Sequence, residues 1–160
     1  MEITDFINEL LKITREKKIY LMKMLDYTKK QTDVINNEDL AILDELINEK
    51  QKIIDTINVL DTDFEIAFGK IKDQMQVKNL SDVMKSKNEK LDELKKEIQD
   101  VVEYIKEIRN QEKLNFNKLS EKKEEIAKKM KGITEGKVAS KKYSGEPMVP
   151  PNPAFFDKKK

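Results

Sequence analysis

The chain contains no cysteine, histidine or tryptophan. Without thiols or imidazoles it cannot form disulfides, bind a metal ion through sulfur or histidine nitrogen, or use either group in nucleophilic catalysis. No Gly-rich phosphate-binding loop is present, and the many carboxylates alternate with lysines on polar surfaces, where nothing separates their pKa values. We therefore expect that the protein is not an enzyme and uses no cofactor and no metal ion.

Neither sign of charge predominates, because 32 basic residues face 31 acidic ones and the net charge is +1. Such a balance gives no general attraction to nucleic acid or to anionic lipid. No apolar run approaches the ~18 residues that a membrane-spanning helix needs, and the first residues are acidic where a signal peptide is basic. We expect a cytoplasmic protein that binds no nucleic acid and inserts into no membrane.

Glycine and proline are nearly absent from most of the chain. Residues 1–131 contain only Gly69 and no proline, whereas residues 132–160 hold the other three glycines and all four prolines. Within a helix, glycine costs ~1 kcal/mol and proline ~3 kcal/mol relative to alanine. The composition therefore predicts a helical body over residues 1–133 and a flexible basic tail over residues 134–160.

Apolar residues recur at spacings of three and four in the body, the pattern of helices with one buried face. The pattern predicts helices over about 2–35, 38–72 and 86–131, with Asn37 as the N-cap of the second and a capping box from Ser86 at the start of the third. The predicted fold class is all-α: an elongated antiparallel three-helix bundle, or coiled-coil hairpin, with a long third helix and an extended Pro-containing tail. The structure of residues 72–90, where the pattern loosens, stays open.

Four polar residues interrupt the predicted apolar seams: Lys17, Gln31, Lys50 and Glu112. Polar residues at such positions usually fix the register and pairing of helices at some cost in stability. We expect these four to have this structural role and not to bind a ligand.

The third predicted helix has more apolar surface than the bundle needs. Its first part carries a dense seam that the two preceding helices can cover, and a sparser stripe continues beyond Ile108 on a helix that should overhang its neighbours. This stripe consists of Phe116, Leu119, Ile126, Met130 and Ile133. It can dock a helix of a partner protein, pack along the hairpin, or form a homodimer seam.

The order of residues in the first two predicted helices resembles the FlgN family of flagellar export chaperones. The similarity covers roughly residues 5–65 and includes the Asn/Asp turn between the helices, and residues 155–160 also resemble family members. The matching residues are Leu10-Leu11, Glu16, Tyr20-Leu21, Leu25, Lys30-Gln31, Val34-Ile35, Asn37, Asp39-Leu40, Leu43, Glu49-Lys50-Gln51, Ile54, Ile57 and Leu60.

The resemblance implies a cytosolic chaperone without enzyme activity. It implies binding to the C-terminal helices of the hook-filament junction proteins, protection of these clients from premature assembly, and their delivery to the flagellar export gate. It places client binding on the C-terminal part of the third helix and gate docking on Tyr143, a tyrosine beyond that helix. The client-binding residues implied in this sequence are Ile105, Ile108, Phe116, Leu119, Ile126, Met130 and Ile133.

A second interpretation is a structural coiled-coil or scaffold protein that has no client. In that case the apolar stripe is permanently covered by a second copy of the same chain, as in other coiled-coil homodimers. A chaperone that forms only a weak homodimer is also compatible with the sequence. The spacing of residues alone does not separate these alternatives.

Overall fold

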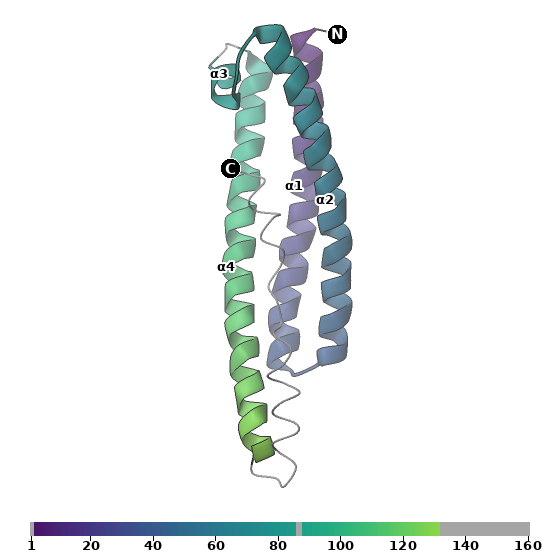
Figure 1. Ribbon diagram of the computed structural model, residues 1–160, viewed down its shortest axis with the longest axis vertical. Coiled ribbons are helices and arrows are strands. Elements are labelled where there is room, and N and C mark those ends of the chain that lie inside the picture. The colour runs from purple at the N-terminus through teal and green to yellow at the C-terminus, as the bar shows by residue number, and fades with distance from the viewer. Residues whose placement is uncertain (1, 86–87, 132–160) are drawn as a thin grey trace.

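The computed structural model describes residues 2–85 and 88–131 (Figure 1). The four helices of this part are α1 (Ile3–Asn36), α2 (Leu40–Met75), α3 (Leu80–Met84) and α4 (Glu89–Lys131). Successive long helices run antiparallel, so α1 and α4 run in the same direction (Figure 1). The predicted all-α antiparallel bundle is confirmed, and its long helices begin and end close to the predicted positions. The tail predicted at residues 134–160 lies outside the described residues.

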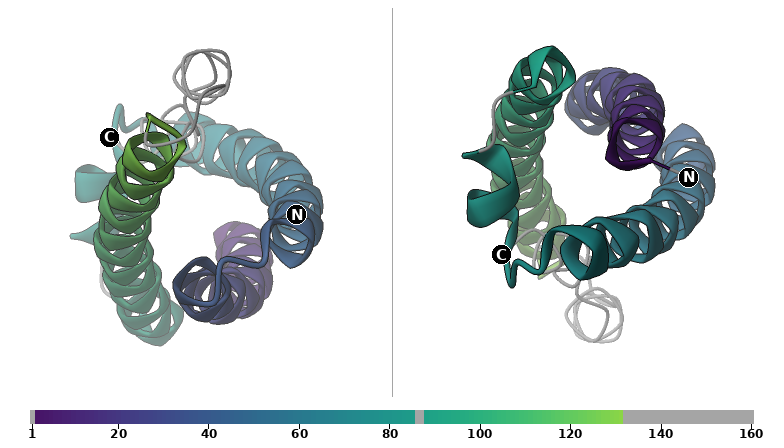
Figure 2. Two further views of the ribbon diagram at one scale, coloured as in Figure 1. Left: turned by 90° about the horizontal axis from the view of Figure 1, so that it is seen from below. Right: turned by 90° about the horizontal axis from the view of Figure 1, so that it is seen from above.

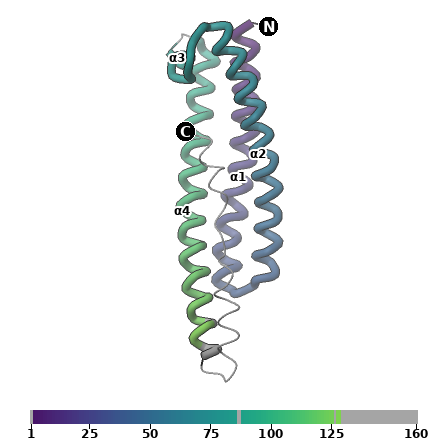
Figure 3. The backbone as a smooth tube through the Cα atoms, in the orientation of Figure 1, coloured from purple at the N-terminus to yellow at the C-terminus, as the bar shows by residue number. Residues whose placement is uncertain are grey.

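Helix α1 is the central helix of the bundle. Its backbone packs closely against both α2 and α4, whereas α2 and α4 approach each other closely at few points. The views along the bundle show α2 and α4 on either side of α1 (Figure 2). Figure 3 shows that α4 continues beyond the turn between α1 and α2. The predicted overhang of the third helix is therefore present.

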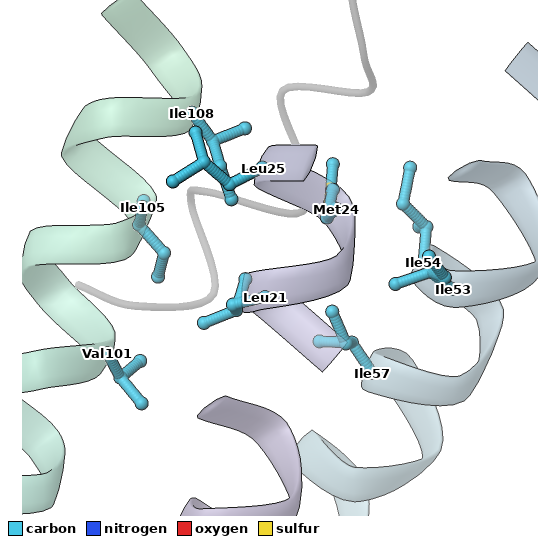
Figure 4. Packing of buried hydrophobic residues seen from close by; sticks show 9 residues of the cluster. All are labelled: Leu21, Met24, Leu25, Ile53, Ile54, Ile57, Val101, Ile105 and Ile108. Atoms are coloured by element: carbon cyan, nitrogen blue, oxygen red, sulfur yellow. The ribbon is translucent and has the colours of Figure 1, made fainter. Parts of the chain in front are cut away.

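Two apolar clusters hold the three long helices together. The first joins α1, α2 and α4 midway along the bundle, and the second joins the same helices and α3 at the end where α1 begins. The first cluster contains Leu21, Met24, Leu25, Ile53, Ile54, Ile57, Val101, Ile105 and Ile108 (Figure 4). The second contains Phe6, Ile7, Leu10, Leu11, Ala67, Ile71, Val83, Leu91 and Leu94. Their spacings of three and four place them on one face of each helix.

The turn between α1 and α2 differs from the prediction. Asn37 is the C-cap of α1, and Asp39 is the N-cap of α2, with its side chain accepting a hydrogen bond from the backbone N–H of Ile42 at 3.3 Å. Between them Glu38 has a φ of 59°, the left-handed conformation that reverses the chain. The predicted N-cap at Asn37 is wrong because this reversal delays the start of α2.

Asparagine side chains organise the connection from α2 to α4. Asn79 caps α3 by accepting a hydrogen bond from the backbone N–H of Asp82 at 2.9 Å. Asn88 accepts one from the backbone N–H of Lys90 at 2.8 Å, and α4 begins at the next residue, Glu89. The helix therefore starts later than the predicted residue 86, and Ser86 itself lies outside the described residues.

Candidate partner-binding surface on helix α4

The proximal half of α4, residues 89–108, is attached to the bundle by apolar packing. Val101, Ile105 and Ile108 are buried against α1 and α2, and Figure 4 shows them pointing toward Leu21 and Leu25. Ile105 and Ile108 were predicted to bind a partner. The structure places them in the core, where a partner contacts them only if α4 separates from α1.

The distal half of α4, residues 109–131, is attached to α1 in a different way. The Asn115 side-chain amide donates to the backbone carbonyl of Thr28 at 2.9 Å. The Thr32 hydroxyl donates to the Asn115 side-chain oxygen and accepts from the Gln111 amide at 2.6 Å. Hydrogen bonds made by polar side chains, to the α1 backbone as well as to other side chains, thus take the place of the apolar contacts found before Ile108.

A buried ion pair marks the boundary between these two halves. Lys50 Nζ lies 2.8 Å from Glu112 Oε1 and donates to Gln31 Oε1 at 2.9 Å, so one polar cluster joins α1, α2 and α4. Burial lowers the pKa of Lys50 and raises the pKa of Glu112, because loss of hydration outweighs their mutual attraction. These contacts confirm the predicted structural role of the three residues.

The fourth predicted seam residue, Lys17, also has a buried partner. Its Nζ lies 2.6 Å from Asp61 Oδ1, which joins α1 to α2. Asp61 was not predicted as its partner, because the position of Asp61 in α2 gives no sign of the lysine opposite. With both groups buried, this pair fixes the register of the hairpin.

Two lysines attach the distal half to the turn between α1 and α2. Lys118 Nζ donates to Asn36 Oδ1 at 2.9 Å, and Lys122 Nζ lies 3.3 Å from Glu38 Oε1. Both contacts are near the surface, where such pairs contribute little to stability. The C-terminal end of α4 extends past the end of the hairpin (Figure 1).

Apolar side chains of the distal half remain uncovered. Phe116 is 38% exposed and Leu119 is half-buried, and both were predicted as binding residues. Leu114 is 55% exposed but lies on the opposite side of the helix, since two residues correspond to a rotation of about 200°. A single exposed leucine is common on protein surfaces, so Leu114 is a control position and not part of the surface.

The remaining predicted site residues cannot be placed. The side chains of Ile126 and Met130 lie outside the described part of the chain, and so do Ile133 and Tyr143 as a whole. Their roles stay predictions. The surface described by the structure therefore consists of Phe116 and Leu119, with the polar α1 contacts alongside them.

These features define a class of protein: an elongated helical bundle in which the apolar face of the distal half of α4 is incompletely buried. Within residues 2–85 and 88–131 no group of three or more acidic side chains is arranged to hold a metal ion. None of the helices in this part of the chain is long and apolar enough to cross a bilayer.

Comparison with protein families matches residues 1–146 to the family described as FlgN protein, and the chain belongs to this family. The match confirms the resemblance of the first two helices and extends it over α4. The family role is that of a flagellar export chaperone without enzyme activity. No curated protein and no solved structure matches the chain.

Proposed function

We propose that this protein is a cytosolic chaperone that binds the C-terminal helices of hook-filament junction proteins. It keeps these clients from assembling prematurely and delivers them to the flagellar export gate. One observation carries the proposal: beyond Ile108, α4 is attached to α1 by hydrogen bonds while Phe116 and Leu119 stay incompletely buried. A surface of this kind accepts a helix without dismantling the apolar core.

The proposed mode of binding is an amphipathic client helix laid against the distal half of α4. Phe116 and Leu119 contact the apolar stripe of the client, and the spacing continues through Ile126, Met130 and Ile133. Burial of these side chains supplies the affinity. Because the client occupies surface that is uncovered beforehand, its release leaves the bundle intact, as a chaperone requires.

The test is to replace Phe116 and Leu119 together by serine and to measure binding of a client C-terminal segment by titration calorimetry. We expect loss of binding with an unchanged circular dichroism spectrum. Leu114→Ser is the matched control, because it removes a more exposed leucine from the same stretch of α4. Normal client binding by the double variant would reject the proposed surface, and a loss of overall helicity would assign both residues to the core.

Docking at the export gate is proposed for Tyr143 on the resemblance alone. Tyr143→Ala should then bind the client segment with normal affinity but fail to associate with the gate in a pull-down. Wild-type recovery of gate proteins by this variant would remove Tyr143 from the proposal.

The scaffold interpretation is kept as a second candidate because Phe116 and Leu119 would also suit a seam between two copies. Sedimentation of the purified chain separates the two. A dimer that persists at low concentration supports the scaffold, and a monomer or a weakly associating dimer supports the chaperone.

A further inference from the structure

We propose that the start of α2 forms a second wall of the client-binding surface, opposite the distal half of α4. The inference rests on the proposed function and adds to it a specificity-determining contact, Ile47. The occupant is an amphipathic client helix with basic residues along the edge that faces α2 and acidic residues along the edge that faces α4.

The buried ion pair fixes which faces of the two helices are opposite each other. Lys50 projects from α2 toward Glu112 of α4, at 2.8 Å. Ile47 lies one helical turn before Lys50, and Phe116 lies one turn after Glu112, each on the same face as its ion-pair residue. Since α2 and α4 run antiparallel, both steps lead toward the turn between α1 and α2. Ile47 and Phe116 are therefore the next pair of residues across this interface.

Both of these side chains are incompletely buried. Ile47 is 39% exposed, nearly the same as Phe116, and Leu40, seven residues before Ile47 on the same face, is 52% exposed. The apolar spacing of α2 predicts that both Leu40 and Ile47 belong to its buried face. They remain exposed because α2 and α4 approach each other closely at few points. Both helices thus present incompletely buried apolar side chains along this interface.

The two walls carry opposite charge. Between residues 38 and 49 the turn and the start of α2 contain five acidic residues and no basic one, whereas residues 113–131 of α4 contain seven lysines and three glutamates. A helix that lies between them is complementary only if its two edges also differ in sign. This asymmetry selects the direction in which a client helix lies, since reversing the helix exchanges its edges.

The exposed apolar area favours an occupant that is released. Leu40, Ile47 and Phe116 are the exposed large apolar side chains described on this surface. A permanent homodimer usually buries a larger and more continuous apolar interface. A client that must be released at the export gate requires a smaller apolar interface. A client helix therefore suits this surface better than a second copy of the chain.

The first experiment compares Ile47→Ser with Ile42→Ser. Ile42 is 43% exposed and precedes Ile47 by five residues, a rotation of about 140°, so it points away from the proposed surface. The probe is a synthetic peptide of the C-terminal helical segment of a hook-filament junction protein, titrated calorimetrically. We expect Ile47→Ser to weaken binding about tenfold or more and Ile42→Ser to change it less than about twofold.

The second experiment does not depend on changes in affinity. Because the chain has no cysteine, Ile47→Cys and Ile42→Cys each introduce a single thiol. Saturating client peptide should slow alkylation of the thiol at position 47 at least about fivefold and leave the rate at position 42 unchanged. Equal rates at position 47 with and without the peptide would overturn the inference.

Failure of this inference and failure of the proposed function are distinguishable. If the Phe116→Ser/Leu119→Ser variant loses client binding while Ile47→Ser binds normally, only the second wall is rejected. If the double serine variant binds normally, the proposed function of α4 is itself rejected. If the wild-type chain sediments as a dimer that Ile47→Ser dissociates, the occupant is a second copy and the inference is overturned.

Discussion

The two halves of α4 have the same secondary structure but differ in how much apolar packing attaches them to the bundle. The proximal half buries Val101, Ile105 and Ile108 against α1 and α2. The distal half is attached by the amide of Asn115 and by the charges of Glu112 and Lys122, with Phe116 left exposed.

The two kinds of attachment contribute differently to the stability of the fold and leave different amounts of apolar surface exposed. Apolar burial contributes roughly 1.5 to 3 kcal/mol for each large side chain, whereas a hydrogen bond contributes a net 0.5 to 1.5 kcal/mol, because water competes for the same groups. The proximal half therefore stabilises the fold. The distal half leaves part of its apolar surface exposed at little cost to the bundle.

The largest expected effect is at the boundary between the halves. Lys50→Met leaves Glu112 buried without its counter-charge and should lower the free energy of unfolding by about 3 to 5 kcal/mol. Urea unfolding followed by circular dichroism measures this. A change below about 1 kcal/mol would mean that water reaches the site and that the boundary is not desolvated.

A second variant sharpens this prediction. Lys50→Met combined with Glu112→Leu replaces the ion pair by apolar side chains and should restore or exceed the wild-type stability. If the double variant is as unstable as Lys50→Met alone, the loss comes from poor packing of methionine and not from an uncompensated charge.

The second prediction compares truncations in the two halves. Ile108→Ala removes a fully buried side chain and should cost about 2 to 5 kcal/mol of unfolding free energy, whereas Phe116→Ala should cost less, about 1 to 2 kcal/mol, because its side chain is already 38% exposed. Thermal or urea unfolding of both variants provides the measurement. Equal costs would contradict the distinction between the halves, because Phe116 would then belong to the core.

The smallest effect is a dependence of stability on pH. Because the pKa of Glu112 is raised above its ordinary 4.5, the folded state holds this proton more tightly than the unfolded chain does. The resulting stability is fully present below pH 4.5 and is lost as the pH rises through the folded pKa. Relative to Glu112→Gln, the wild type should therefore lose stability as the pH is raised from 4.5 through the folded pKa of Glu112. Unfolding free energies of both proteins across this range provide the test, and a constant difference would contradict it.

Much of the fold could be predicted from the sequence. The absence of proline before residue 132 and the apolar spacing indicate three long helices, and polar residues such as Lys50 and Glu112 stand out within the seams. Phe116 and Leu119 could be assigned to the third helix beyond its dense seam, and the structure leaves them incompletely buried. These features depend on the spacing of apolar and polar residues along the chain, which can be read directly from the sequence.

Other features depend on how the helices approach one another and could not be predicted. Spacing places Ile47 on the inner face of α2 but does not show that α4 leaves it exposed. It also gives no sign that Asn115 bonds to α1, that Asp61 pairs with Lys17, or that Glu38 takes the left-handed conformation. These features depend on the distances and angles between the helices and on the geometry of the turn, which residue spacing does not contain.

The most direct test of the account is amide hydrogen exchange along α4, with and without a client C-terminal segment. In the free chain we predict faster exchange for residues 111–122 than for residues 98–108, because hydrogen bonds and ion pairs contribute less net stability than the apolar packing of the proximal half. Addition of the client segment should slow exchange mainly in the distal half. Equal protection of both halves in the free chain, or no slowing of the distal half by the client, would contradict the claim that this half is kept available for a partner.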